Sequence, residues 1–220
     1  MRIGELRLEP GLSRRVSAVD LVRDTLRAAI LRGDIPGDSR LVQTEIASQL
    51  GVSTTPVREA MRDLASKGLI VMDSHRIGTV RKPDWDEMVE IVQVRRALEP
   101  VAIEHVMANV TPEHLRVARS LAEQLSSEED LGSWVEKNIR FHSVFHDATR
   151  TSRLSDILIA LEEAGGVFVA QAQQLHPEIR KRAVADHFAL LEALEDKAAE
   201  RAVAIQHGHI NLPLEIYDND

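Results

Sequence analysis

The chain has no cysteine among its 220 residues. A disulfide framework and a thiolate metal site are therefore excluded, and the composition is compatible with a reducing compartment. No run of apolar residues is long enough to cross a bilayer, and the N-terminal MRIGELRLEP lacks the apolar centre of a signal peptide. We therefore expect a soluble cytoplasmic protein that makes no contact with a membrane.

Recognised catalytic motifs are also missing. The sequence contains no HExxH metal-protease pair, no GxSxG nucleophile elbow and no phosphate-binding P-loop. Glu and Asp side chains that could act as a general base are abundant. The missing motifs therefore argue against an enzyme, although the abundant carboxylates leave a general base available.

The formal net charge of −8 gives the whole chain little attraction for nucleic acid. The charges are unevenly distributed, because residues 1–82 carry a net charge of +4 and residues 83–220 one of −12. Phosphate backbones attract the first segment and repel the second. This asymmetry favours two parts with different tasks, although scattered surface charge also accounts for an excess as small as +4.

Residues 17–33 are predicted to form the first helix of an N-terminal domain. Ser17-Ala18-Val19-Asp20 reads as a capping box with Ser17 at the N-cap. Apolar residues follow at helical spacing, and Gly33 ends the helix before the turn cluster 34–38. The preceding residues, 1–16, have mixed charge and no periodicity, so we expect a loose arm there.

Two more helices and a hairpin complete this domain. A short helix over residues 44–50 stops at Gly51, and the next helix opens with Thr55 as its cap and Pro56 at its first position. Two short strands are predicted after it, at residues 69–72 and 79–81. Two helices joined by a tight turn and followed by a hairpin are typical of a winged helix-turn-helix over residues 17–82.

The helix that follows Pro56 is the candidate for insertion into the major groove. Arg58 lies in its first turn, opposite an apolar stripe, where a guanidinium can make a bidentate contact to guanine. Any single arginine on such a helix could equally be a solvated surface residue. The other candidate DNA contacts are Thr44, Ser53, Thr54, Thr55 and Arg62, together with His75 and Arg76 at the hairpin tip.

The stretch LRAAILRGDIPGDSRLVQTEIASQLGVSTTPVREAMRDLASKGLI resembles the winged helix of GntR-type regulators. The likeness covers residues 17–82 and is carried by Ile30-Leu31-Arg32-Gly33, Pro36-Gly37, Leu41, Gly51-Val52-Ser53, Pro56-Val57-Arg58-Glu59-Ala60 and Gly68-Leu69. The resemblance implies a domain that binds double-stranded operator DNA. That family usually has arginine after Val-Ser, where this chain has Thr54, and this departure bears on the operator sequence and the affinity.

Residues 83–220 are predicted to form a helical domain, with Pro83 at the boundary. No pattern of period two and no internal repeat occurs there. We predict an antiparallel bundle of helices over about 85–110, 111–126, 131–149, 154–174, 177–194 and 197–210. The expected fold is mainly α, with an N-terminal winged helix-turn-helix and a C-terminal all-α bundle.

This second part resembles the FCD-type ligand-binding domain of the FadR subfamily over residues 84–211. The likeness is carried by Val94-Arg95-Arg96-Ala97-Leu98-Glu99-Pro100, Asn138-Ile139-Arg140-Phe141-His142, Asp186-His187-Phe188 and His209-Ile210. The resemblance implies dimerisation, a small carboxylate effector and a divalent metal ion. Its ligands would be Asn138, His142, His187 and His209.

The spacing of Asn138 and His142 places both on one face of a helix, where they can reach the same centre. Three imidazoles and one oxygen suit zinc, nickel or a similar divalent ion. The family commonly has Asp at the position of Asn138, and a neutral amide is a weaker ligand that adds no charge. His146 is a rival ligand, and a set of buried histidines without metal is the alternative.

Arg95 is the candidate second anchor for an effector. Its planar guanidinium matches the geometry of a carboxylate. An ion pair with Glu99, four residues later on the same helix, is equally compatible with the spacing. Both interpretations remain open at this point.

These patterns together predict a homodimeric transcriptional regulator, a repressor that binds a short palindrome and responds to a small organic acid. Two alternatives stay open. One is a metal-dependent hydrolase or isomerase with a DNA-binding appendage, because a three-histidine centre with an open position also suits hydrolysis. The other is a regulator whose metal ion is purely structural.

Overall fold

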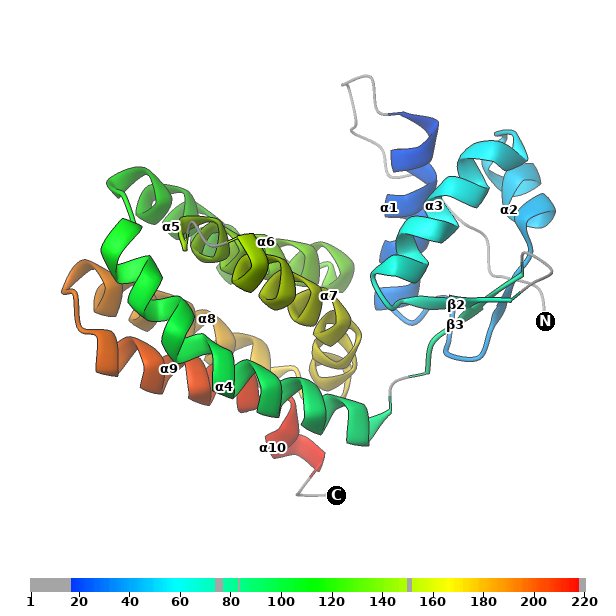
Figure 1. Cartoon of the computed structure of the whole chain (residues 1–220). Coiled ribbons are helices and arrows are strands. Elements are labelled where there is room, and N and C mark those ends of the chain that lie inside the picture. Colours follow the sequence, from blue (N-terminus) through cyan, green and yellow to red (C-terminus); the bar gives the residue numbers. More distant parts are fainter. Residues whose placement is uncertain (1–16, 74–76, 83, 150–151, 218–220) are drawn as a thin grey trace. The chain divides into compact units, whose positions relative to one another are not determined.

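The computed structural model describes residues 17–73, 77–82, 84–149 and 152–217 (Figure 1). It divides into two compact units, Met1–Pro83 and Asp84–Asp220. The predicted arm at residues 1–16 and the predicted boundary at Pro83 lie outside the described residues. Within the described part of the chain, no helix combines the length and the apolar character that a membrane crossing requires.

The first unit is a winged helix-turn-helix, as the sequence predicts. Its helices are α1 (Ala18–Leu31), α2 (Gln43–Leu50) and α3 (Thr54–Ser66), and its strands are β1 (Arg40–Leu41), β2 (Ile70–Met72) and β3 (Gly78–Val80). The strands form an antiparallel sheet in the order β1-β3-β2. The hairpin of β2 and β3 is therefore confirmed, whereas β1 is too short to leave a periodic signal in the sequence.

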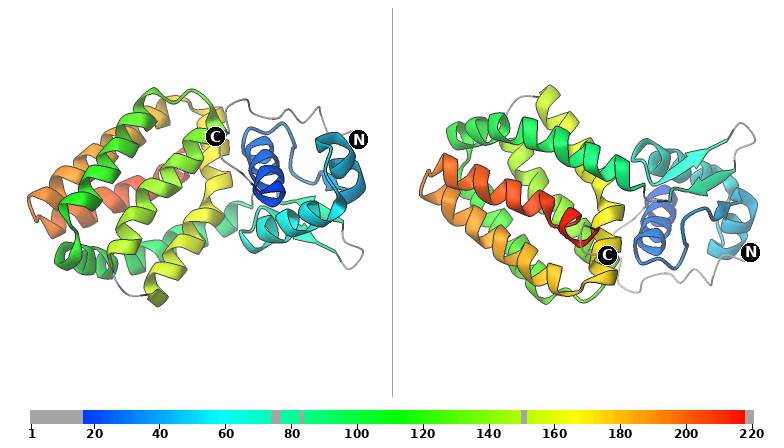
Figure 2. Two further views of the ribbon diagram at one scale, coloured as in Figure 1. Left: turned by 90° about the horizontal axis from the view of Figure 1, so that it is seen from above. Right: turned by 90° about the horizontal axis from the view of Figure 1, so that it is seen from below.

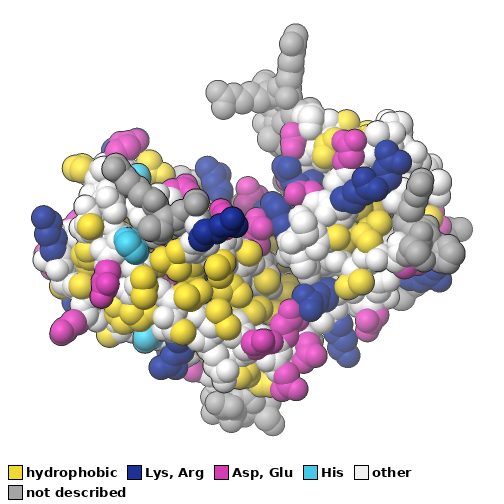
Figure 3. Space-filling view, in the orientation of Figure 1, with side chains coloured by type: hydrophobic (Ala, Val, Ile, Leu, Met, Phe, Trp, Pro, Cys, Tyr) yellow, Lys and Arg dark blue, Asp and Glu magenta, His cyan; other side chains and the backbone are white. Residues whose placement is uncertain are grey.

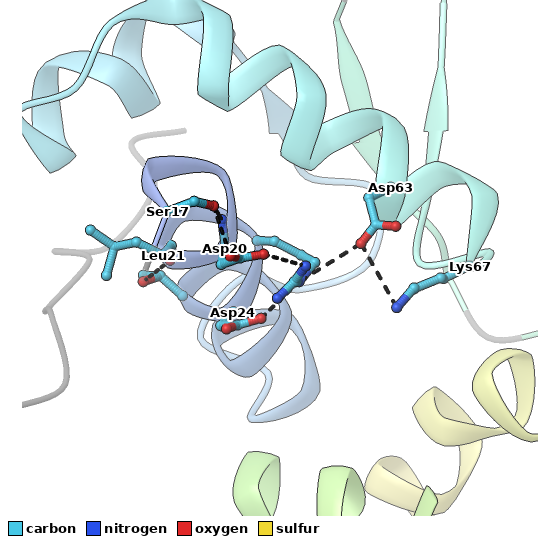
Figure 4. Close-up of polar contacts among 8 residues, drawn as sticks. Ser17, Asp20, Leu21, Asp24, Asp63 and Lys67 are labelled. Atoms are coloured by element: carbon cyan, nitrogen blue, oxygen red, sulfur yellow. Dashed lines mark hydrogen bonds and ion pairs between the residues drawn. The ribbon is translucent and has the colours of Figure 1, made fainter. Parts of the chain in front are cut away.

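Helix α3 is held against α1 by its apolar stripe. Four stripe residues are fully buried, namely Val57, Ala60, Met61 and Leu64. At the rim of this contact Arg23 of α1 lies 2.8 Å from Asp20 and Asp24 and 3.8 Å from Asp63 of α3 (Figure 4). These ion pairs are partly exposed, so solvent screens them and they add little to stability. Burial of the stripe therefore fixes the position of α3, and only the contact of Arg23 with Asp63 joins the two helices at this rim.

The ends of these helices follow the residues at their caps. Ser17 caps α1 as predicted, because its Oγ accepts a hydrogen bond from the Asp20 amide at 3.1 Å. The predicted start of α3 is wrong by two residues: Ser53, not Thr55, occupies the N-cap, and Pro56 is the third helical residue. Proline is tolerated there because the first four amides of a helix have no carbonyl partner within it.

The second unit is a helical bundle (Figures 1 and 2). Its helices are α4 (Trp85–Asn109), α5 (Pro112–Ser127), α6 (Leu131–Ala148), α7 (Ser152–Leu175), α8 (Glu178–Glu195), α9 (Ala199–Asn211) and α10 (Leu214–Tyr217). Helix α6 packs against both α5 and α7, and α9 packs against both α4 and α8. The six long helices match the predicted ones to within about two residues at each end, whereas the short α10 was not predicted.

Proline lies inside α4 without ending it. Pro100 has no amide hydrogen, so the carbonyl of Arg96 one turn earlier loses its helical donor. The Nε2 atom of His207 on α9 lies 3.1 Å from that carbonyl and donates to it. The helix therefore continues through the proline, and the freed carbonyl becomes a link between α4 and α9.

Candidate functional site

The leading end of α3 is accessible in the N-terminal unit. Ser53, Thr54 and Thr55 are exposed, and the first turn of the helix contains no acidic residue. The Ser53 side chain makes no capping hydrogen bond to its own helix. Free amides at a helix N-terminus attract anions such as phosphate. This end of α3 therefore presents hydroxyl and amide donors without a competing negative charge.

Arg58 lies in the next turn of α3 and is half-buried. Among the described residues its buried Nε atom has no hydrogen-bond partner. Arg62, one turn later, and Thr44 on α2 are exposed. The predicted contacts at the hairpin tip, His75 and Arg76, lie outside the described residues.

The second unit brings three of the predicted metal ligands together in its interior. His142 comes from α6, His187 from α8 and His209 from α9, and their nearest ring nitrogens all lie within 4.8 Å of one another. The Nε2 atoms of His142 and His209 are 3.2 Å apart. The packing of the helices therefore brings together histidines that are up to 67 positions apart in the sequence.

The surroundings of this cluster fit a cation. Among the described residues, both ring nitrogens of His187 and the side-chain oxygen of Asn138 are buried without a hydrogen-bond partner. Leaving buried polar atoms unpaired costs about 1–3 kcal/mol each, so such atoms call for a partner. Asp186 lies 3.5 Å from the Nδ1 atom of His209 and can orient that ring from outside. Three nitrogens and an amide oxygen are a donor set for a borderline divalent ion.

Burial favours the neutral, metal-binding form of His142 and His187. Burial, and next the neighbouring His209, lower the pKa of His142 well below its usual value. The same two causes lower the pKa of His187 well below its usual value. Metal ligation requires unprotonated nitrogen, so these two ligands do not have to lose protons near neutral pH to accept an ion.

His146, the rival ligand, lies on the same face of α6 but outside this cluster. Its ring is buried, and burial lowers its pKa to about 4. It lines a second pocket, together with Glu99, Gln206 and His142 of the cluster. Asn138 lines the same pocket as His209, whereas His146 is not among the three histidines whose nitrogens converge.

Arg95 is buried in α4 between two carboxylates. Its Nη2 atom lies 3.0 Å from Glu99 of the same helix and 2.7 Å from Glu162 of α7. These ion pairs raise the pKa of Arg95, although burial alone would lower it. Burial raises the pKa of Glu162 to about 7 against the opposing attraction of Arg95. The intrahelical pair with Glu99 predicted as the alternative is thus present, and a second carboxylate adds to it.

A cavity that is partly open to solvent adjoins these groups, with an empty volume of about 550 Å³ that includes part of the solvent at its mouth. Its polar lining is formed by Arg95, Trp134, Asn138, Glu162, Gln173 and His209. The remaining walls are mostly apolar and come from α4, α7, α8, α9 and the segment that follows α9. A mostly apolar pocket with a few converging polar groups is the usual form of a small-molecule site.

Sequence reasoning missed Glu162, Gln173 and Gln206 as buried polar residues of this region. One signal was available for Glu162, because it follows the fully buried Leu158 by four residues and so lies on the same face of α7. Without that signal, the adjacent Glu162 and Glu163 look like residues on the solvent-exposed face of a helix. The partners of Glu162 lie on other helices and leave no local pattern.

Comparison with protein families gives two matches. Residues 90–212, more than half of the chain, match the family model described as FCD domain. Residues 19–80 match the model described as bacterial regulatory proteins, gntR family. The two matched ranges lie in the two compact units of the structure.

Named relatives are regulators of transcription. The HTH-type transcriptional regulator McbR of Escherichia coli is 27% identical over 197 residues, which cover 86% of this chain and 88% of McbR. A Paenarthrobacter nicotinovorans protein named "Probable D-xylose utilization operon transcriptional repressor" is 43% identical over 89 residues, but the match spans only 39% of that protein.

Solved structures show the same fold. The structure of E. coli McbR/YncC has a TM-score of 0.75 at 24% identity and covers 93% of this chain and 99% of that chain. A structure titled as a putative GntR transcriptional regulator from Rhodococcus sp. RHA1 has a TM-score of 0.73 at 21% identity, with 92% and 99% covered. At this identity the likeness concerns the fold alone.

Proposed function

The chain belongs to the GntR family of bacterial regulatory proteins and carries an FCD domain, and on this basis we propose that it is a repressor controlled by a small carboxylate bound at a metal centre. DNA binding and regulation of transcription follow from the family. The proposal goes further than the family. It adds repression, control by a carboxylate effector, a divalent metal ion, action in the cytoplasm and the lack of catalytic activity.

The observation that carries the proposal is the position of the histidine cluster at the wall of the large cavity. His209 and Asn138 line the cavity, and His142 and His187 lie behind them in the interior. A divalent cation held there would supply positive charge and an open position for an oxygen ligand. The cavity beside it combines apolar walls with a few polar groups, as sites for small organic ligands do.

The apolar walls of the cavity indicate what kind of organic acid the effector is. Met88, Ile91 and Val92 of α4 form part of one wall, and Val169 of α7 belongs to another. Arg95 is already neutralised by two carboxylates, so it offers an incoming anion less attraction than a free guanidinium would. We therefore expect the effector to place its carboxylate at the metal and a less polar part against these walls.

A homodimer is the proposed assembly. Figure 3 shows hydrophobic side chains gathered on one face of the helical unit, over α4 and α7. Exposed large hydrophobic residues of these helices include Val94, Val101 and Ile157. A contiguous apolar surface of this kind is typical of an interface, and a two-fold dimer would present two α3 helices to the half-sites of a palindrome.

A thermal-shift screen tests effector binding. We expect the metal-loaded chain to be stabilised by at least one acid from a panel of sugar acids and dicarboxylates, by about 2.7 kcal/mol at a hundredfold excess over the dissociation constant. The amide of the same acid serves as the control, because it keeps the shape but lacks the anionic ligand. The proposal fails if no acid raises the melting temperature more than its amide does.

A further inference from the structure

Glu162 is a buried carboxylate next to the histidine cluster that neither the family patterns nor the spacing of residues singled out. We propose that Glu162 is the anionic ligand of the metal centre, in the role that the neutral Asn138 cannot fill. The inference rests on the proposed metal site. It concerns which residue of this particular chain balances the charge of the ion.

The position of Glu162 on α7 allows this role. Its Oε1 atom lies 3.9 Å from the Nε2 atom of His142. Two atoms that bind one ion at about 2.1 Å each lie no more than about 4.2 Å apart. Glu162 also lines the same cavity as Asn138 and His209. A small rotation of its side chain would therefore bring the carboxylate into the same coordination sphere.

The charge of the site calls for such a ligand. Three imidazoles and an amide are all neutral, so a divalent ion bound by His142, His187, His209 and Asn138 alone would keep its full charge in the interior. A buried charge without a counter-charge costs several kcal/mol. Glu162 is 5% exposed, so its carboxylate interacts with the ion under weak solvent screening.

The ion pair with Arg95 does not oppose this assignment. Arg95 contacts two carboxylates, and Glu99 alone balances its single charge. Glu99 is held in place independently, because Gln206 donates a hydrogen bond to its Oε1 atom at 3.2 Å. Glu162 can therefore turn towards a metal ion without leaving Arg95 as an unpaired buried charge.

Titration of the full-length protein with Co²⁺ tests the assignment. Wild type is compared with Glu162→Gln, which keeps the shape of the side chain and removes its charge. We expect Glu162→Gln to bind Co²⁺ about 10- to 100-fold more weakly than wild type. Glu163→Gln is the matched control, because it removes the same charge from the neighbouring position of α7 and should bind as wild type does.

A second substitution separates ligation from a general loss of structure. Asn138→Asp replaces the neutral amide on α6 with a carboxylate. This change should strengthen Co²⁺ binding more in the Glu162→Gln background than in wild type. Such non-additivity is expected when two residues supply the same charge to one ion. If Glu162→Gln does not fold, a crystal structure of the Co²⁺-loaded wild type replaces the titration, with a Glu162 oxygen expected about 2.1 Å from the ion.

The outcomes distinguish this inference from the proposed function. Equal Co²⁺ affinity of wild type and Glu162→Gln, or a loaded structure in which Glu162 stays on Arg95 alone, overturns the role of Glu162 and leaves the metal centre standing. Failure of the wild type to bind Co²⁺, Zn²⁺ or Ni²⁺ at all overturns both.

Discussion

Replacing His142 and His187 together with alanine is expected to abolish metal binding. The two rings come from different helices and meet edge to face, with centroids 5.2 Å apart. Their loss removes two of the three imidazoles and leaves His209, Asn138 and the proposed ligand Glu162, which is too weak a set for a tightly bound divalent ion. Elemental analysis of the purified protein after loading and desalting measures the change, with about one equivalent expected for wild type and a trace for the variant.

His146→Ala is the matched control for that experiment. It also removes a buried imidazole from α6, but His146 lies outside the histidine cluster. We expect it to retain the metal. Undiminished metal in the double variant would place the ligands elsewhere, and loss of metal in His146→Ala alone would make His146 the ligand instead of Asn138.

Arg58→Ala is expected to weaken operator binding by about 1–3 kcal/mol, or about 5- to 150-fold in affinity, if its guanidinium contacts a base in the major groove. Arg58 is half-buried on α3, and its Nε atom has no partner among the described residues. The side chain as a whole is partly exposed, so its terminal guanidinium is the group that we expect to reach the DNA. Fluorescence anisotropy with labelled promoter DNA measures the change, and the dimer should persist.

Arg58→Lys separates base recognition from simple attraction to phosphate. Lysine keeps the positive charge but loses the planar pair of donors that matches guanine. A base contact predicts that Arg58→Lys resembles Arg58→Ala on the operator. Unchanged operator affinity in Arg58→Ala would remove this residue from the interface.

The sequence predicts the helices of both units well, because their apolar residues recur at helical spacing and their ends carry capping residues or glycine. Gly51, for example, has the positive φ of 66° that glycine adopts readily, and it ends α2 where predicted. The strand β1 and the helix α10 escape prediction because two to four residues are too few to show a period.

The histidine cluster could be predicted from the sequence only through resemblance. The spacing of Asn138 and His142 indicates a shared face, but nothing local connects them to His187 or His209, which reach the cluster by the packing of α8 and α9. The contacts of Glu162 are even harder to predict from the sequence. Its burial follows from Leu158, four residues before it, whereas its contact with Arg95 depends on how α4 and α7 pack.

The coupling between the two units is the central claim, and operator affinity measures it most directly. The full-length, metal-loaded protein is titrated against its own promoter and a scrambled duplex, with and without the acid that gives the largest thermal shift. We predict that the promoter is preferred and that the acid changes its dissociation constant at least about 5-fold, a coupling of about 1 kcal/mol. In the variant lacking His142 and His187, the acid should have no effect. Equal binding of both duplexes, or an effect of the acid that persists in that variant, would contradict the account.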